Sequence, residues 1–156
     1  MAKGTPATVF VEKAGVVFRL HEYEYDPTAA RIGMQAAEAL GISPARLLKT
    51  LMAKAGDDVL CVLVPSDREV SLKKLAAAAG AKHATMLAPG AAERLTGYRV
   101  GGISPFGQRR RGKFFLEADA LSHPTVIVNG GRRGLQIEIA PADLVRLTQA
   151  ALVSLS

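Results

Sequence analysis

Apolar and polar positions follow two different periods along this chain, and together they predict short strands mixed with short helices. The longest uninterrupted apolar run, residues 59–64, is typical of a central strand that is covered on both faces. In residues 16–25 and 135–139, apolar side chains occupy alternate positions, which predicts strands with one buried face. Shorter apolar runs predict further strands at residues 113–116 and 125–128.

Helix boundaries are indicated by capping residues. Thr5-Pro6 is typical of an N-cap followed by proline at the first helical position, and Gly15 would end that helix. Ser71 would cap a helix that runs through Ala79. Further helices are expected at residues 33–40, at residues 88–95 and after Pro141, and a helical turn is expected to start at Ser43-Pro44 and lead into Lys49-Thr50.

The length of 156 residues suits one domain, and no repeat, low-complexity tract or linker divides residues 1–156. Hydrophobic residues make up 49% of the chain and aromatic residues only 5%, so we expect a largely aliphatic core. The order of the elements predicts a single mixed α/β domain.

Basic residues outnumber acidic ones by 20 to 14, and the net charge of +6 favours an anionic partner, nucleic acid first. A basic protein without a polyanionic partner remains the alternative. The first residues contain no apolar segment of the signal-peptide type, and residues 59–64 are too few to span a bilayer. The expectation is therefore a cytoplasmic protein that does not enter a membrane.

Two glycine-rich segments, residues 97–108 and 129–134, are the strongest candidates for a functional site. Glycine lets a ligand approach the backbone, whose N–H groups can bind a carbonyl or phosphate oxygen, although each segment alone could be a simple turn. Arg109-Arg110-Arg111 and Arg132-Arg133 flank them and could bind phosphate, or could simply be solvated. Lys49-Thr50 precedes an apolar stretch, where the lysine is either a phosphate ligand or a surface residue.

No familiar catalytic constellation is present in the sequence. The three histidines do not have metal-ligand spacing, and there is no Gly-x-Ser-x-Gly segment and no glycine-rich nucleotide-binding motif. Cys61 lies inside the apolar run at residues 59–64, where a thiol acts as a small hydrophobic group. We therefore expect no metal and no cofactor.

The residues resemble the YbaK/EbsC family, and within it the YbaK-type Cys-tRNA(Pro) deacylases, over nearly the whole chain. The resemblance rests on motifs that occur in this order: Thr5-Pro6-Ala7, His21-Glu22-Tyr23 with Asp26, Lys49-Thr50-Leu51, Leu72-Lys73-Lys74, Thr96-Gly97-Tyr98, Gly101-Gly102-Ile103-Ser104-Pro105 with Gly107-Gln108, and Gly130-Gly131 with Arg133-Gly134-Leu135-Gln136. Each motif alone is weak, and the ordered set is specific.

The resemblance implies a single compact α/β domain in which a curved mixed sheet forms a partly closed barrel surrounded by helices. A related domain is the editing insertion of bacterial prolyl-tRNA synthetases, so such a synthetase is an expected partner. The implied activity is removal of cysteine from mischarged Cys-tRNA(Pro). In this branch the cysteinyl thiol attacks its own ester carbonyl, which yields a cyclic thiolactone and free tRNA, and no protein nucleophile is needed.

The same resemblance assigns roles to individual residues. Lys49 would contact the phosphate near the terminal adenosine, Thr50 would contact the same end of the tRNA, and Gly101 would donate a backbone N–H to the ester. Tyr23 and Asp26 would form the pocket wall. The remaining candidates are Gly102, Ser104, Asn129, Gly130 and Gly131 for substrate binding, and Arg109, Arg110, Arg132 and Arg133 for tRNA binding.

One position departs from the family pattern, because Asn129 stands where the family commonly has serine. Its larger amide could reshape the amino-acid pocket, which leaves the identity of the amino acid open. One alternative is a deacylase for another small amino acid such as alanine, which would need a water nucleophile and a base that the sequence does not reveal. The other is a non-catalytic module that binds tRNA or a synthetase.

Overall fold

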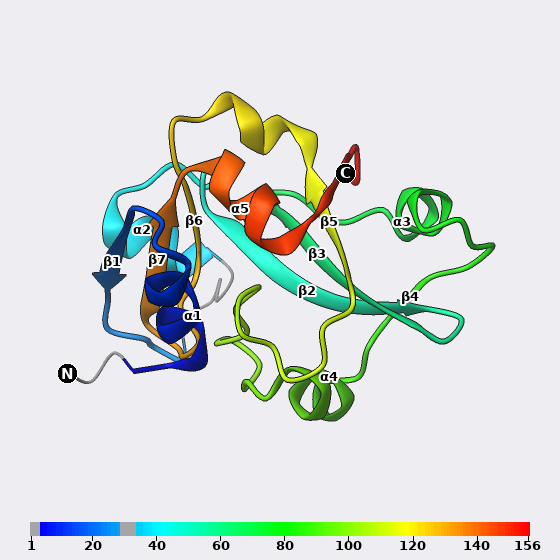
Figure 1. Cartoon of the computed structure of the whole chain (residues 1–156), viewed down its shortest axis with the longest axis horizontal. Helices are drawn as coiled ribbons and strands as arrows, with labels where there is room; N and C mark the ends of the chain where they lie inside the picture. The colour runs from blue at the N-terminus through cyan, green and yellow to red at the C-terminus, as the bar shows by residue number, and fades with distance from the viewer. Residues whose placement is uncertain (1–3, 29–33) are drawn as a thin grey trace.

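Five α-helices, one 3₁₀ helix and eight strands form the part of the chain that the computed structural model describes, residues 4–28 and 34–156 (Figure 1). The helices are α1 (Pro6–Ala14), α2 (Gln35–Leu40), α3 (Leu72–Ala78), α4 (Pro89–Thr96), η2 (Ala118–Ser122) and α5 (Pro141–Thr148). The strands are β1 (Phe18–Glu22), β2 (Leu48–Ala55), β3 (Asp58–Pro65), β4 (Thr85–Met86), β5 (Lys113–Glu117), β6 (Val126–Asn129), β7 (Leu135–Ile139) and β8 (Ala151–Val153).

The strands belong to two sheets. The smaller sheet is antiparallel with the order β1-β7-β6, and the larger one has the order β4-β2-β3-β5-β8, in which β3–β5 and β5–β8 pair in parallel. An isolated parallel bridge between Leu47 and Ile127 joins them, and the Ile127 N–H donates to the Arg46 carbonyl at 2.9 Å. The α/β class is thus confirmed, but two sheets replace the expected single one, and they do not close into a barrel.

The predicted central strand is confirmed in β3, whose two faces pack into different parts of the core. Cys61 and Leu63 belong to the cluster that fills the space among both sheets, α1, α4 and α5. Leu60, Val62 and Val64 point the other way, into a second cluster that includes α3 residues. Burial raises the pKa of the Cys61 thiol to about 12, which fits the predicted structural role of this residue.

Local capping signals proved reliable where helices begin. The Thr5 hydroxyl accepts a hydrogen bond from the Thr8 N–H at 3.1 Å, Pro6 opens α1, and Gly15 ends it with a φ of 72°. At the start of α3, the Ser71 hydroxyl accepts from the Lys74 N–H at 3.2 Å. Both N-terminal caps were predicted from the sequence.

Two expectations for the middle of the chain need correction. The helical turn expected from Ser43-Pro44 is present as a turn over residues 44–46, but the chain then enters β2, a strand that was not predicted from the sequence. A two-residue loop, Gly56-Asp57, connects β2 to β3 in a hairpin. The helix expected at 33–40 appears as α2 from Gln35, and Gly33 itself lies outside the described residues.

Among the described residues, none of the helices combines the length and the apolar character that crossing a bilayer requires.

Candidate active site

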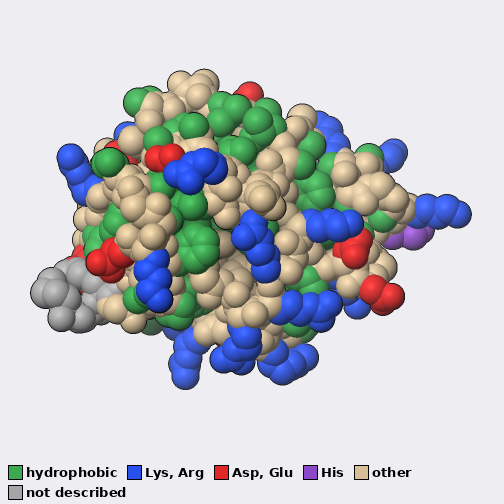
Figure 2. All heavy atoms as spheres, viewed as in Figure 1, with side chains coloured by type: hydrophobic (Ala, Val, Ile, Leu, Met, Phe, Trp, Pro, Cys, Tyr) green, Lys and Arg blue, Asp and Glu red, His purple; other side chains and the backbone are tan. Residues whose placement is uncertain are grey.

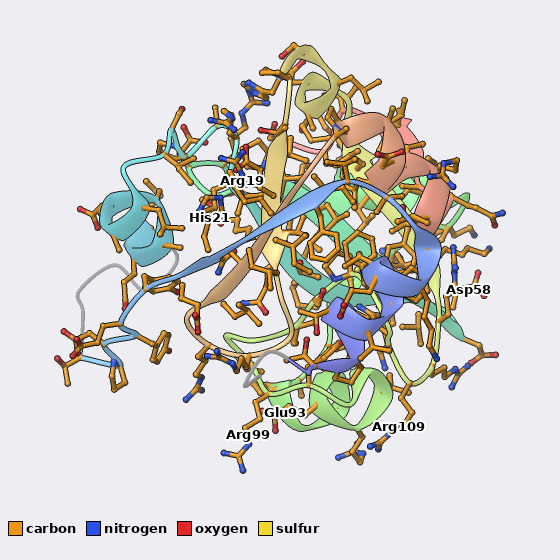
Figure 3. The ribbon with its side chains drawn as sticks, turned by 60° about the vertical axis from the view of Figure 1, so that its left-hand side comes forward. Arg19, His21, Asp58, Glu93, Arg99 and Arg109 are labelled. Carbon is orange, nitrogen blue, oxygen red and sulfur yellow. The ribbon has the colours of Figure 1, made fainter. Side chains whose placement is uncertain are left out.

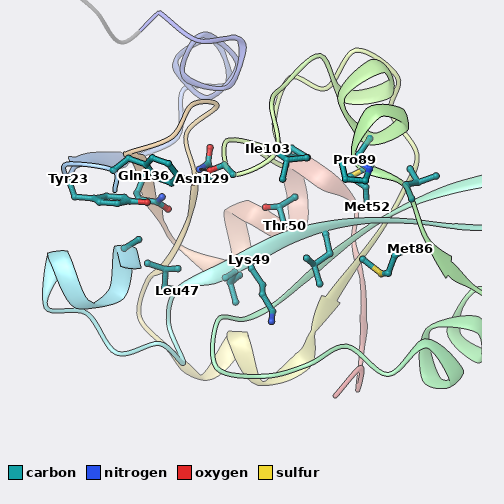
Figure 4. A pocket seen from close by; sticks show the side chains of 18 residues that line it. Tyr23, Leu47, Lys49, Thr50, Met52, Met86, Pro89, Ile103, Asn129 and Gln136 are labelled. Carbon is teal, nitrogen blue, oxygen red and sulfur yellow. Dashed lines mark hydrogen bonds between the residues drawn. The ribbon is translucent and has the colours of Figure 1, made fainter. Parts of the chain in front are cut away.

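A cavity of about 350 Å³ lies against an open edge of β2 (Figure 4). At one end of this edge Leu47 bridges to β6, and at the other end β4 pairs with Ala53 and Lys54. Between these contacts, the edge of β2 over residues 48–51 has no partner strand within the described part of the chain. The small sheet and β4 therefore leave a gap between them along this edge, and the cavity occupies it.

The lining of the cavity is apolar at one end and polar at the other. Met52, Met86 and Pro89 lie together at the end near α4 and β4, whereas Tyr23, Asn129 and Gln136 lie at the end near the small sheet (Figure 4). The remaining lining residues are Tyr25, Ala36, Leu47–Leu51, Leu87, Ala92, Val100, Gly101 and Ile103. Of the residues predicted for the site, the structure thus brings Tyr23, Lys49, Thr50, Gly101 and Asn129 together.

Lys49 and Thr50 are consecutive in β2, so their side chains leave opposite faces of the strand, yet both line the cavity (Figure 4). The Thr50 hydroxyl is buried and has no hydrogen-bond partner among the described residues. Lys49 is half-buried and likewise pairs with no carboxylate there. Leaving a buried hydroxyl unpaired costs about 1–3 kcal/mol, so this position favours completion by a ligand.

Gly101 lies on the cavity surface with a φ of 90°, a conformation that side chains rarely adopt. Its N–H forms no hydrogen bond with any described residue, while its carbonyl accepts one from Asn129 Nδ2 at 3.1 Å. A Cβ at this position would lie 3.0 Å from Arg133 Nε and 3.6 Å from the Tyr25 hydroxyl. The N–H of Gly101 is therefore unpaired among the described residues, and there is little space for a side chain at this position.

The two glycine-rich loops, residues 97–108 and 129–134, are held against each other. Asn129 donates to the Gly101 carbonyl, and its Oδ1 accepts from the Gly131 N–H at 2.7 Å, so one side chain braces both loops. At Gly102, an added Cβ would lie 2.8 Å from Arg132 Cα. The absence of a side chain at residue 102 thus lets two backbones meet, and does not admit a ligand as the sequence had predicted.

Several residues predicted for substrate binding do not line the cavity. Asp26 is exposed, and its carboxylate accepts from the N–H and hydroxyl of Thr28, which lowers the pKa of Asp26. Ser104 is fully buried and accepts from the Phe106 N–H at 3.2 Å, in the manner of a turn-forming serine. Gly102 packs against the backbone of Arg132, Gly130 against Leu135, and Gly131 against Thr5 and Tyr98.

The four predicted tRNA-binding arginines fall into two pairs. Arg109 and Arg110 are exposed and make no ion pair with a described residue, and Figure 3 shows Arg99 and Arg109 projecting beside α4. Basic side chains gather on this lower edge of the molecule in Figure 2. Arg132 instead pairs with Glu22 at 2.7 Å, and Arg133 lies over the Tyr25 ring at 5.1 Å. Only the first pair is fully available to a phosphate backbone.

Two residues of the polar end were not predicted for the site. Tyr25 contributes its ring, and Gln136 is only 4% exposed although it occupies the position in β7 that strand alternation assigned to solvent. The sequence held one signal for burial of residue 136: a neutral amide, not a charged side chain, lies between two apolar residues that face the core. Burial, followed by the neighbouring Tyr25, raises the pKa of Tyr23. Within the described residues, no three histidine, cysteine or acidic side chains are grouped as metal ligands would be.

Comparison with known proteins identifies the type of domain. The family model described as the aminoacyl-tRNA editing domain matches residues 26–147, which include all the polar residues of the cavity other than Tyr23 and Tyr25. The chain belongs to the aminoacyl-tRNA editing domain family. The predicted resemblance is therefore confirmed.

Individual relatives of this editing domain agree with that membership. EbsC of Enterococcus faecalis, provisionally named a Cys-tRNA(Pro)/Cys-tRNA(Cys) deacylase, is 37% identical over 148 residues, which cover 92% of this chain and 88% of EbsC. The proline–tRNA ligase of Pelotomaculum thermopropionicum is 35% identical over 105 residues, 62% of this chain and 18% of the ligase. A crystal structure described as a provisional trans-editing enzyme for prolyl tRNA synthetase has a TM-score of 0.85, covers 97% of this chain and 94% of its own, and at 24% identity shows the shared fold.

Proposed function

We propose that this editing domain is a trans-acting deacylase that removes cysteine from mischarged Cys-tRNA(Pro). One observation carries the proposal: the described cavity lining holds cationic, hydroxyl and N–H donors but no histidine or carboxylate that could act as a base, and no cysteine or serine. Such a site can bind and polarise an ester but has no evident nucleophile or base, so the nucleophile is best supplied by the substrate. The name given to EbsC, a relative of similar length, supports cysteine as the amino acid.

In the proposed reaction, the cysteinyl sulfur attacks the carbonyl carbon of its own ester. The bond between that carbon and the 3′ oxygen of the tRNA breaks, a cyclic thiolactone forms, and the oxygen leaves with the thiol proton. The Gly101 N–H, which is unpaired among the described residues, donates to the carbonyl oxygen as negative charge develops there. Because attacking and leaving groups belong to one molecule, orientation in the cavity supplies most of the acceleration.

The tRNA end is held by groups around the same opening. Lys49 contacts the phosphate next to the terminal adenosine, and the unpaired Thr50 hydroxyl binds the same nucleotide. Tyr23 forms the wall at the polar end. Arg109 and Arg110 guide the acceptor stem by phosphate contacts, with Arg132 and Arg133 beside the loop.

The other predicted site residues do not line the cavity but hold the loops and segments around it in place. Gly102 allows the two loops to pack together, Gly130 leaves room for Leu135, Gly131 leaves room for Thr5 and Tyr98, and Ser104 fixes the turn of the first loop. Asp26 shapes the segment that follows β1. Because part of a prolyl-tRNA synthetase is similar to this chain, that synthetase is the partner that we propose for presenting the tRNA.

Amino-acid release from proline tRNA charged with cysteine, serine or alanine tests the proposal. The thiol mechanism predicts release of cysteine alone. Release of alanine would instead favour a water nucleophile, to which the cavity offers no base among its described residues. Binding of tRNA without release of any amino acid would support a non-catalytic module and contradict the proposal.

A further inference from the structure

The amide of Gln136 lies at the polar end of the cavity and has no hydrogen-bond partner among the described residues. Gln136 is 4% exposed, lines the cavity, and its side chain forms no hydrogen bond within residues 4–28 and 34–156. Amides in the interior of proteins are almost always paired, and the Gln136 amide, which borders the cavity, can form hydrogen bonds only with groups that enter it. An unpaired amide that faces a cavity therefore indicates a ligand group at that place.

The position of Gln136 relates it directly to the loop that holds Gly101. In the β6–β7 ladder Gln136 is the partner of Asn129, and Cβ atoms of directly opposed residues lie about 4.5–5.5 Å apart. Asn129 in turn donates to the Gly101 carbonyl at 3.1 Å. Figure 4 shows Gln136 beside Tyr23 and Asn129, at the opposite end of the cavity from Met52 and Met86.

We infer that Gln136 determines specificity by accepting a hydrogen bond from the free α-amino group of the aminoacyl ester. This inference rests on the proposed function, which places the ester carbonyl at the Gly101 N–H. The amino nitrogen is bonded to the carbon next to that carbonyl, so it must lie close to the residues around Gly101. No acidic side chain lines the described cavity, and Asn129 Oδ1 already accepts from Gly131, which leaves Gln136 Oε1 as the free amide acceptor.

The inferred contact would make the site selective for an unblocked amino acid. In a peptidyl or N-acylated ester, the same nitrogen is an amide that carries a bulky acyl group. Such an ester loses the charge-assisted hydrogen bond to Gln136 and must fit its acyl group into the polar end of the cavity. The site would therefore act on newly charged tRNA and spare tRNA that carries a growing peptide.

Binding of two ligands that cannot be deacylated tests this contact: 3′-(L-alanylamino)-3′-deoxyadenosine and its N-acetyl derivative, each titrated by calorimetry or NMR. The wild type should prefer the free amine by about ten- to a hundredfold, the range for a hydrogen bond to a charged group. Gln136→Leu should abolish the preference, and Gln136→Glu should increase it, because a carboxylate of the same shape attracts the ammonium group more strongly.

Gln108→Leu is the matched control, since it removes a different, half-buried amide that donates to the Ser104 carbonyl and does not line this cavity. Its ratio of affinities should stay at the wild-type value, with melting curves showing that all variants are folded. The inference would be overturned if Gln136→Leu kept the wild-type preference, or if the wild type bound neither ligand at millimolar concentration. It would also be overturned if Gln136→Leu lost affinity for both ligands equally, because that would indicate a contact to the base or the sugar. Because neither ligand can react, a preference that depends on Gln136 without any cysteine release would contradict only the proposed function.

Discussion

Replacing Gly101 by alanine should damage catalysis far more than folding. The new Cβ would lie 3.0 Å from Arg133 Nε and 3.4 Å from Arg133 Cγ, at a residue whose φ is 90°. A non-glycine residue in this conformation costs about 1–2 kcal/mol, and for a domain of this size that lowers Tm by roughly 2–8 °C. Alanine keeps the backbone N–H, but the strained backbone and the new Cβ would move that N–H away from the ester carbonyl, and loss of one preorganised oxyanion donor costs about a hundred- to a thousandfold in kcat. We therefore expect a folded Gly101→Ala protein with at most about 1% of wild-type kcat.

Gly97→Ala provides the matched control for this prediction. Gly97 belongs to the same loop and has a φ of 82°, but its added Cβ would meet Arg109 at 3.5 Å, and it does not line the cavity. The two variants should lose similar amounts of stability in thermal melts. Single-turnover deacylation of Cys-tRNA(Pro) should then be slow only for Gly101→Ala. If both variants lost activity in proportion to stability, or if Gly101→Ala were fully active, the assignment of the Gly101 N–H would be refuted.

Two further predictions concern tRNA binding and acid stability. Lys49→Ala should lose a phosphate contact of about 1.5–3 kcal/mol, seen as a ten- to hundredfold lower kcat/KM with an unchanged melting curve; unchanged kinetics would show that Lys49 is only a surface residue. The pKa of Glu138 is lowered, first by the hydrogen bond from the Thr125 hydroxyl and then by His21 at 2.7 Å. Glu138 therefore stabilises the folded protein above the ordinary carboxylate pKa, and this stabilisation is lost as the pH falls through the lowered pKa of Glu138. Urea titrations from pH 6 down to pH 2 should accordingly show a smaller acid-induced loss in Glu138→Gln than in the wild type, and equal losses would mean that Glu138 is not responsible.

Elements that depend on neighbouring residues in the sequence could be predicted. The caps at Thr5 and Ser71 form hydrogen bonds within three residues. The apolar run of β3 indicates that both faces of the strand are buried, whichever elements cover them. β2 was missed because Lys49 and Thr50 interrupt its apolar pattern at the open edge. The Gly56-Asp57 pair before the β3 run was the hairpin signal that could have revealed it.

The composition of the site was harder to predict because its parts are distant in the sequence. That Gly102 accommodates the backbone of Arg132 follows only from the packing of two loops 30 residues apart, which local sequence does not encode. The alternation of β7 assigned Gln136 to solvent, since the pattern cannot show that the second face of the strand borders a cavity. The sequence motifs and the family resemblance supplied Tyr23, Lys49, Thr50, Gly101 and Asn129, whereas the structure added Tyr25 and Gln136.

The most direct test of the account compares cysteine and serine on the same proline tRNA, with the purified protein under single-turnover conditions. The two esters differ only in sulfur and oxygen, so their fit in the cavity is nearly the same, while the hydroxyl is a much weaker nucleophile at neutral pH. The account predicts rapid release of cysteine, with a thiolactone that can be trapped by an added amine, and little release of serine. Equal rates for the two esters would contradict it.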